Sequence, residues 1–369
     1  MSEIRPLDLQ DVPQVASMFM RVLRKEPGTP SSGLVDYLSR IFLEPPGHDP
    51  EIVSQVHVRD DGSVSGFIGV IPLALTLEDR PLRAAIASTY MVEDHESDPF
   101  AGARLLRGFL AGPQDISLTE TANDISTTMW RKMRGTVLAD YSLEWLRVIR
   151  PAAFMIEAAA RATRLARLAS PLARPFDALI RRSPDEAAWS HLSPAVHGNR
   201  LLPGADIDDD EAAWLLRHFS SDFPMRPAWK EEDLAAMVVH SRSKPNYGSM
   251  VRRKVSSRSG SPVGMFLYYG NKARIGRAIQ ILAAPGHEGA VIDAMLADAD
   301  QRGLAALRGR TQPALLNAML GRRFSFVHSA SSIVHARDTS LVAPFRSGQA
   351  FFNGFAGESW TRLIGGRFD

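Results

Sequence analysis

A pattern of secondary structure occurs twice in this chain, with copies that begin at residues 84 and 276. Each copy has an apolar strand, a tight loop, a helix, a second strand, a short helix and a turn that contains glycine. The first copy reads AAIASTYMVEDHESDPFAGARLLRGFLAG and then ISLTETANDISTTMWRKMRG; the second reads GRAIQILAAPGHEGAVIDAMLADADQRG and then LAALRGRTQPALLNAMLGRRF. Because the order and the spacing agree, a duplicated α/β unit explains the chain better than one large domain. Loops between a strand and a helix N-terminus can also bind phosphate groups.

The composition indicates an ordinary globular protein. Of the 369 residues, 45% are hydrophobic and 23% are charged, and the formal net charge is +2, which gives no reason to expect a nucleic-acid partner. The chain has no cysteine, which excludes disulfides, thiolate metal sites and a cysteine nucleophile. The charged N-terminus does not resemble a secretory signal, and no long apolar run follows. We therefore expect a cytoplasmic location.

Hydrophobic periodicity and turn residues predict the elements of both halves. In the first half we expect a helix that begins at Asp8 or Asp11 and runs to Arg24, helices at 32–43, 99–111 and 123–133, strands at 2–6, 51–59, 63–77, 80–92 and 115–121, and one or two further strands up to 149. In the second half we expect helices at 208–220, 229–240, 287–302 and 313–320, and strands at 248–256, 262–270, 273–284, 304–310, 324–337 and 350–364. The first strand of the second copy is not placed by the pattern.

A segment rich in alanine, leucine and arginine separates the two halves. It covers 150–184, and its helical pattern is interrupted by Pro171 and Pro175. The favoured interpretation is an amphipathic linker that packs across both domains with its arginines solvated; the alternative is contact with an anionic membrane surface or an acidic partner. The predicted division is a first domain at 1–149, a linker at 150–187 and a second domain at 188–369.

Two segments of the first half resemble the GNAT (N-acetyltransferase) superfamily. The opening IRPLDLQDVPQVASMFMRVL is similar to the first strand and helix of that fold, and NDISTTMWRKMRG is similar to its late helix. The second half resembles it through the order of elements and the segment LLNAMLGRRFSFV. The resemblance covers 1–147 and, less closely, 200–369. It implies an α/β fold (α+β, with mixed sheets) of two tandem GNAT-like acyl-CoA N-acyltransferase domains joined by a helical linker.

The resemblance also implies where an acyl-CoA would bind. In such proteins the fourth and fifth strands diverge and hold the pantetheine arm like an added strand, while the next helix N-terminus takes the pyrophosphate. Here those strands are 80–92 and 115–121. The implied co-substrate is acetyl-CoA or another acyl-CoA, with no metal, and the implied binding residues are Val92, Ala101, Gly102, Ala103, Arg104 and Asn123.

Three residues are candidates for proton transfer when an amine attacks the thioester. Glu120 and Glu93 end the fifth and fourth strands, where a carboxylate can act as general base. Tyr90 is the candidate acid for the leaving thiolate, because Trp130 occupies the place where the family often has a tyrosine and an indole is no useful proton donor. The structural alternatives are a solvated strand end for the glutamates and packing for Tyr90.

Arg308 and Arg310 are the candidate acceptor-binding residues of the second half. Residues two apart on a strand face the same side, and two guanidinium groups suit a carboxylate, sulfate or phosphate. The alternative is a strand terminus stabilised by salt bridges.

Together these features favour an acyl-CoA-dependent N-acyltransferase that acts on an amine of a small molecule or peptide. One alternative is a catalytically degenerate tandem module that serves binding or assembly. Another is an aminoacyl-tRNA-dependent transferase of the Fem type, whose helical insertion would be longer and richer in lysine than the segment at 150–184.

Overall fold

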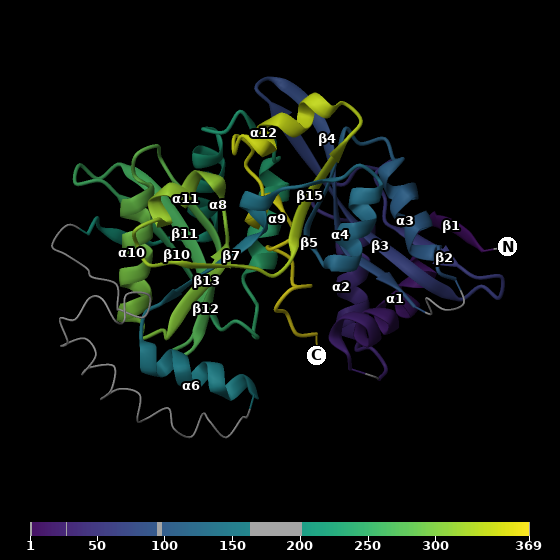
Figure 1. Cartoon of the computed structure of the whole chain (residues 1–369), viewed down its shortest axis with the longest axis horizontal. Coiled ribbons are helices and arrows are strands. Elements are labelled where there is room, and N and C mark those ends of the chain that lie inside the picture. The colour runs from purple at the N-terminus through teal and green to yellow at the C-terminus, as the bar shows by residue number, and fades with distance from the viewer. Residues whose placement is uncertain (1, 27, 94–97, 163–200, 369) are drawn as a thin grey trace.

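Two mixed β-sheets, each covered by helices, form the protein (Figure 1). The computed structural model describes residues 2–26, 28–93, 98–162 and 201–368. Within these ranges no helix combines the length and the apolar character needed to span a bilayer.

The first half begins with a strand, a helical region and three consecutive strands, and only after these do helices and strands alternate. Its elements are β1 (Glu3–Pro6), η1 (Leu9–Asp11), α1 (Val12–Met18), η2 (Phe19–Arg24), α2 (Ser32–Leu43), β2 (Gln55–Val58), β3 (Val64–Leu77), β4 (Arg80–Val92), α3 (Ala101–Leu110), β5 (Ile116–Ala122), α4 (Asp124–Lys132), β6 (Thr136–Val137), α5 (Ala139–Ser142), β7 (Leu143–Val148) and α6 (Pro151–Ala162).

The second half repeats this order with short additions. Its elements are β8 (Gly204–Asp206), α8 (Asp209–Ser220), β9 (Met225–Pro227), α9 (Glu231–Ser241), β10 (Ser249–Ser256), β11 (Pro262–Gly270), β12 (Ile275–Ala283), α10 (Glu288–Gln301), β13 (Ala306–Arg310), α11 (Pro313–Met319), β14 (Ser325–His328), β15 (Ser331–Ala336), η4 (Thr339–Val342), α12 (Ala343–Arg346) and η5 (Gly354–Ala356).

The two halves exchange one strand. The first sheet has the order β1-β2-β3-β4-β5-β15-β6, with β9 also paired to β3, and the second has the order β14-β7-β13-β12-β11-β10-β8. Strand β7 therefore lies between two strands of the second half, and β15 lies between two strands of the first. Each half completes the sheet of the other, an arrangement that the repeat pattern does not predict. The domain limits at 149 and 188 remain a prediction about the chain.

Hydrophobic side chains fill the layers on both sides of each sheet. Helices α3 and α4 cover one face of the first sheet with Leu105, Leu106 and Trp130, and α10 and α11 cover one face of the second. The largest cluster is continuous between the halves, because α1 and α2 of the first and α8 and α9 of the second contribute to the same core. Burial of apolar surface thus holds the two sheets together.

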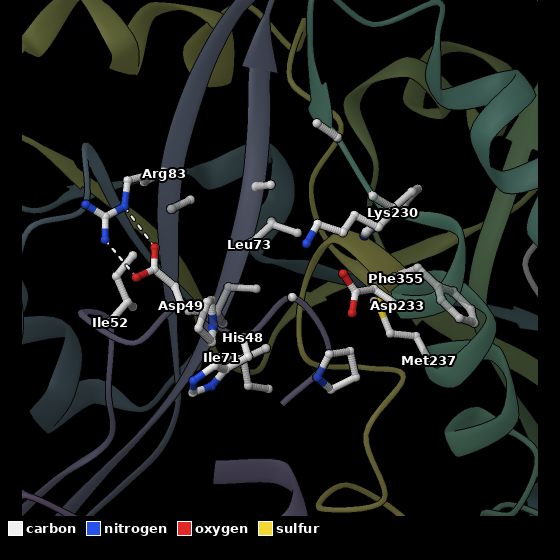
Figure 2. Close-up of a pocket in the computed structure, with 18 of the residues that line it drawn as sticks. His48, Asp49, Ile52, Ile71, Leu73, Arg83, Lys230, Asp233, Met237 and Phe355 are labelled. Atoms are coloured by element: carbon white, nitrogen blue, oxygen red, sulfur yellow. Dashed lines mark hydrogen bonds and ion pairs between the residues drawn. The ribbon is translucent and has the colours of Figure 1, made fainter. Parts of the chain in front are cut away.

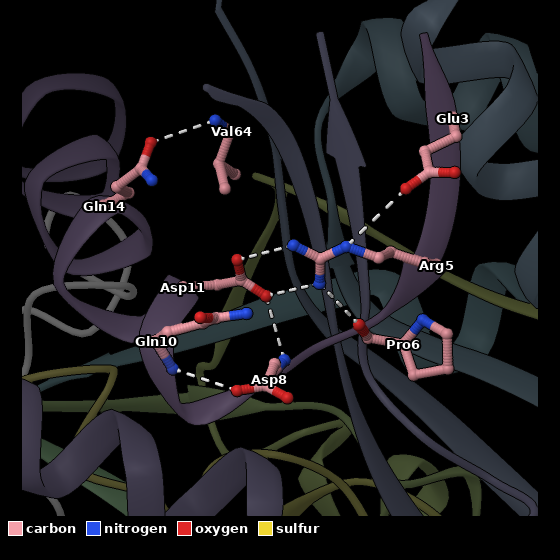
Figure 3. Close-up of polar contacts among 8 residues, drawn as sticks. All are labelled: Glu3, Arg5, Pro6, Asp8, Gln10, Asp11, Gln14 and Val64. Carbon is pink, nitrogen blue, oxygen red and sulfur yellow. Dashed lines mark hydrogen bonds and ion pairs between the residues drawn. The ribbon is translucent and has the colours of Figure 1, made fainter. Parts of the chain in front are cut away.

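The start of the first helix is fixed by a capping box (Figure 3). The Asp8 side chain accepts a hydrogen bond from the Gln10 N–H at 3.2 Å, and Asp11 Oδ2 accepts one from the Asp8 N–H at 2.9 Å. Arg5 of β1 donates two hydrogen bonds, of 2.6 and 2.8 Å, to the same Asp11 carboxylate. These contacts satisfy the free N–H groups of the helix start and position β1 beside it.

Most predicted elements agree with the structure, and one prediction is wrong. The helix at 32–43 and the strand at 262–270 have the predicted bounds. The strand predicted at 350–364 does not form: Ala350 makes one isolated bridge to Met225, and the chain then turns at Asn353 and Gly354, which both have positive φ angles. Its aromatic residues pack in the core that the two halves share instead of on one sheet.

The linker predicted at 150–187 begins as a helix, α6, and its part at 163–187 lies outside the described residues. Arg150 donates a hydrogen bond of 2.8 Å to the Asp300 carbonyl, and Glu157 forms an ion pair of 2.7 Å with Arg274. Both contacts hold α6 to the second half. Contact of the linker with a membrane or an acidic partner stays a prediction.

The strand exchange predicts that a change in the second half weakens the first sheet. Ile333 of β15 is fully buried against α3 and α4 of the first half. We expect Ile333→Ala to lower the free energy of unfolding by about 2–5 kcal/mol and to increase amide hydrogen exchange in β5 and β6. Val327→Ala, at a side chain that is 55% exposed, should leave the amide hydrogen exchange of β5 and β6 unchanged. If Ile333→Ala instead increased amide hydrogen exchange only in β13 and β14, the placement of β15 in the first sheet would be contradicted.

Candidate functional site

Strands β4 and β5 pair over only a short stretch and then separate. Their parallel pairing joins Ala84 to Ile116 and ends where Ile86 pairs with Leu118, although β4 continues to Val92. Ser88 is an extra residue in β4, because Val70 of β3 pairs with Ala87 and Gly69 pairs with Thr89. A bulge at this point increases the local twist and directs the rest of β4 away from β5.

The second half repeats this geometry. Strands β12 and β13 pair in parallel from Ile275 to Arg277, and Ile279 is an extra residue in β12. This second opening is in contact with the C-terminal segment, which we define as residues 350–368. The Phe355 N–H donates to Gln280 Oε1 at 3.1 Å, and Gly354 leaves no room for a side chain there, since a Cβ would lie 2.2 Å from the same oxygen.

A cavity of about 210 Å³ lies between the first sheet and the second half (Figure 2). We call it the interface cavity. Its walls come from three parts of the chain: the first half supplies 46–49, Ile52, 71–74, 82–84 and Ile86; α9 and the residues before it supply 228–230, Asp233 and Met237; and the C-terminal segment supplies Phe355, Gly357 and Trp360.

Charged groups lie on opposite sides of this mainly apolar cavity. On one side Arg83 donates two hydrogen bonds, of 2.9 and 2.8 Å, to the Asp49 carboxylate. Partial burial opposes the charged form of Asp49, but hydrogen bonds from the Glu51 backbone and from Arg83 outweigh it and lower the pKa of Asp49. On the other side are Lys230 and Asp233 (Figure 2).

The predicted base Glu120 is fully buried and contacts the C-terminal segment. Its Oε2 accepts a hydrogen bond of 2.9 Å from the Glu358 N–H, and its Oε1 accepts one of 2.8 Å from the Ser359 hydroxyl. A Cβ at Gly357 would lie 2.3 Å from Oε2, so the segment passes directly over this carboxylate. The catalytic role of Glu120 stays a prediction, and its observed contacts anchor the C-terminal segment to β5.

Two more ionisable groups are buried beside Glu120. Glu358 accepts a hydrogen bond of 2.5 Å from the Thr121 hydroxyl, and burial together with the Glu120 charge raises the pKa of Glu358 to about 8. Lys244 donates hydrogen bonds to the carbonyls of Thr361 and Ile364, and burial lowers the pKa of Lys244 to about 7. We call Glu120, Glu358, Lys244 and Arg310 the polar junction.

Tyr90, near the end of β4, and Glu93, directly after it, contact different parts of the first half. Tyr90 points into the layer of α3 and α4, where its hydroxyl lies 3.9 Å from Met129 Sδ. Burial raises the pKa of Tyr90, so its hydroxyl is protonated at neutral pH. Glu93 forms an ion pair of 2.7 Å with Arg21. Neither residue lines the interface cavity, and their proton-transfer roles stay predictions.

The predicted acyl-CoA residues gather around the separated ends of β4 and β5. Val92 and Tyr90 contact the position of Gly102 in the first turn of α3, which also holds Ala101 and Ala103. Arg104 pairs with Asp98 and lies 2.7 Å from His57 Nε2. Across the opening, Asn123 accepts a hydrogen bond of 2.9 Å from the Ser126 N–H and caps α4. The loop at 94–97 lies outside the described residues.

The two arginines predicted to bind an acceptor have protein partners. Arg308 Nε lies 3.3 Å from Glu144 Oε1. Arg310 donates hydrogen bonds to the carbonyls of Glu120, Ser142 (3.2 Å) and Ala330 (3.0 Å), and so links the two sheets within the polar junction. Neither arginine lines the interface cavity, and an acceptor-binding role for them stays a prediction.

Sequence reasoning did not find the residues that line the cavity. Asp233 lies in the first turn of α9 beside Glu231 and Glu232, where acidic residues are expected because they favour a helix N-terminus. Asp49 and Arg83 are far apart in the sequence and have no motif in common. The one available signal was the cluster of aromatic residues at 351–360, which could have indicated a segment buried between domains.

Comparisons with known proteins identify the fold. A GCN5-related N-acetyltransferase from Anabaena variabilis has a TM-score of 0.57 at 10% identity and covers 91% of this chain and 73% of its own. A GCN5-related N-acetyltransferase from Kribbella flavida has a TM-score of 0.53 at 10% identity, and the match covers 94% of this chain and 72% of the Kribbella chain. An Enterococcus faecalis protein described as a probable N-acyltransferase has a TM-score of 0.60 at 8% identity, and the match covers 93% of this chain and 74% of the Enterococcus chain.

These likenesses extend over almost the whole chain, whereas no family model and no curated protein sequence matches it. The chain therefore has the fold of GNAT acyltransferases, with mixed sheets in a tandem arrangement, as its sequence predicted.

The polar junction predicts a specific pH dependence of stability. Because the pKa of Glu358 is higher in the folded state than in the unfolded state, the folded protein binds the extra proton, and stability falls as pH rises through about 5 to 8. Relative to Glu358→Gln, the wild-type free energy of unfolding should fall by up to about 1.4 kcal/mol per pH unit in this window.

Urea unfolding at several pH values measures this difference. Lys244, whose folded-state pKa is lowered, adds stability as pH rises above about 7, so the comparison is made between about pH 5 and pH 7. The exposed control Glu232→Gln should follow the wild-type curve at every pH. Parallel curves for wild type and Glu358→Gln would mean that Glu358 is not protonated in the folded protein.

Proposed function

We propose that this chain is an acyl-CoA-dependent N-acyltransferase that transfers an acetyl or longer acyl group to the amine of a small molecule. The observation that supports this most is the meeting of two features at one place. Ile86, at which the pairing of β4 with β5 ends, also lines the interface cavity. So does Gly357, which lies against Glu120 of β5. A thioester held between the separated strands would thus face a cavity able to hold an acceptor.

The donor would bind along the free edge of β4 in the first half. A separated strand offers backbone N–H and C=O groups to an extended pantetheine chain, and the N-terminus of α3 favours the negative charge of a pyrophosphate. Two of the acidic residues at this loop are neutralised, because Glu93 pairs with Arg21 and Asp98 pairs with Arg104. The residues assigned to the donor are Val92, Ala101, Gly102, Ala103, Arg104 and Asn123.

The first half is favoured over the second because of what contacts each opening. Gly354 and Phe355 contact the bulge of β12 directly, and a Cβ at Gly354 would lie 2.5 Å from the Ile279 carbonyl oxygen. In the first half the C-terminal segment contacts β5 and forms part of the cavity wall, which leaves the cavity itself open to an acceptor.

The reaction forms a bond between the amine nitrogen and the acyl carbon and breaks the bond between that carbon and sulfur. The amine loses a proton, which water in the cavity accepts and passes to the solvent, and the leaving thiolate gains one. We assign the second proton to Tyr90, whose hydroxyl lies beside Gly102 at the opening and regains its own proton from water. We assign Glu120 to holding the C-terminal segment, because both of its carboxylate oxygens accept hydrogen bonds from that segment.

The size of the cavity favours a small acceptor. Sites for drug-sized ligands have volumes of roughly 300–1,000 Å³, and the interface cavity has about 210 Å³.

A variant that fills the cavity tests this assignment. Leu73 is buried in β3 and lines the cavity, so we expect Leu73→Trp to occupy the acceptor space while leaving the donor site intact. Wild type and variant should both gain thermal stability with acyl-CoA, by about 2.7 kcal/mol at a concentration 100 times Kd. The variant should lose at least about tenfold in kcat/KM for an amine acceptor.

The matched control is Leu320→Trp, at a side chain that is 63% exposed in a turn, and it should retain wild-type turnover. Stabilisation of Leu73→Trp by acyl-CoA would show that this variant is folded. If no acyl-CoA stabilises the wild type at millimolar concentration, the transferase proposal fails. If Leu73→Trp turns over as fast as Leu320→Trp, the acceptor is bound elsewhere.

A further inference from the structure

We infer that the second half selects the acceptor, and that the acceptor is a compact apolar amine with a single positive charge, recognised by Asp233. This inference rests on the proposed function and adds the class of substrate to it. It follows from the chemistry of the cavity walls, which come from the first sheet on one side and from α9 on the other (Figure 2).

The body of the acceptor is indicated by the apolar lining. Leu73 and Ile86 of the first sheet and Trp229, Met237 and Phe355 of the second half line the cavity. Aromatic and branched side chains of this kind bind an apolar group by excluding water from it, and among the five named here only the buried Trp229 Nε1–H is left without a hydrogen-bond partner in the described residues. A sugar or a polyamine backbone would lose hydrogen bonds to water in this space without replacing them.

The charge of the acceptor is indicated by Asp233. Its neighbours in the first turn of α9, Glu231 and Glu232, are exposed, whereas Asp233 is half-buried and faces the cavity. Within the described part of the chain, no side chain forms an ion pair or a hydrogen bond with this carboxylate. A carboxylate at an apolar cavity without a cationic partner favours binding of an ammonium group.

The remaining charges limit the acceptor to one cation. Arg83 is paired with Asp49 through two hydrogen bonds and with the exposed Glu51 at 2.9 Å, so its positive charge is neutralised on that side of the cavity. Lys230 also lines the cavity, from an exposed position. Its ammonium group would repel a second positive charge near Asp233. The net preference is for a monoamine over a polyamine.

Direct binding measurements test this inference without relying on catalysis. Isothermal titration of the full chain would use 2-phenylethylamine, its neutral analogue 2-phenylethanol, and spermidine, a polycation without an apolar ring. We expect 2-phenylethylamine to bind at least about tenfold more tightly than either of the others, because only it pairs an apolar body with one ammonium group.

Asp233→Asn should weaken the binding of 2-phenylethylamine about tenfold and leave that of 2-phenylethanol unchanged. Glu232→Gln, in the same helical turn but exposed, should change neither. The inference is overturned if spermidine binds wild type as tightly as 2-phenylethylamine does, if Asp233→Asn behaves like Glu232→Gln, or if 2-phenylethylamine does not bind at millimolar concentration.

A second assay separates failure of this inference from failure of the proposed function. Release of free CoA from acyl-CoA in the presence of a broad panel of amines measures transfer itself. Transfer to spermidine but not to 2-phenylethylamine would keep the transferase proposal and reject the acceptor class. Tight, Asp233-dependent binding of 2-phenylethylamine without any release of CoA would keep the recognition site and reject the transferase.

Discussion

Strand β5 can pair along two edges, and the second half of the chain supplies the partner for one of them. Strand β15 pairs with β5 along its whole length, from Ala122 to Ile116, whereas β4 pairs with it over only three residue pairs. Because β15 fixes the direction of β5, the bulge at Ser88 can direct β4 away without loss of the sheet. The opening in the first half therefore depends on a strand from the second half.

The same dependence extends to the region between the sheets. The C-terminal segment crosses from the bulge of β12 to Glu120 of β5 and supplies part of the cavity wall. Burial of Glu120, Glu358 and Lys244 along its course costs free energy, since these polar and ionisable groups lose their hydration. Hydrogen bonds to the backbone and to Thr121 offset part of that cost and fix the position of the segment.

The sequence was sufficient for elements with a clear period and clear ends. The helix at 32–43 and the strands at 80–92 and 262–270 have the predicted bounds, and the repeat and its resemblance to GNAT proteins predicted the fold. The exchange of β7 and β15 could not be predicted, because a strand with a given pattern fits either of two similar sheets. Asp233 was missed because its sequence neighbours are those of an ordinary helix start.

The site is thus a property of contacts between distant segments, and the account depends most on the opening between β4 and β5. A crystal structure of the full chain with CoA bound tests it most directly. The account predicts the pantetheine arm between β4 and β5 of the first half, with its thiol near Ile86 and its pyrophosphate at the start of α3. CoA bound only at the second opening, or β4 and β5 paired along their full length with CoA outside, would contradict it.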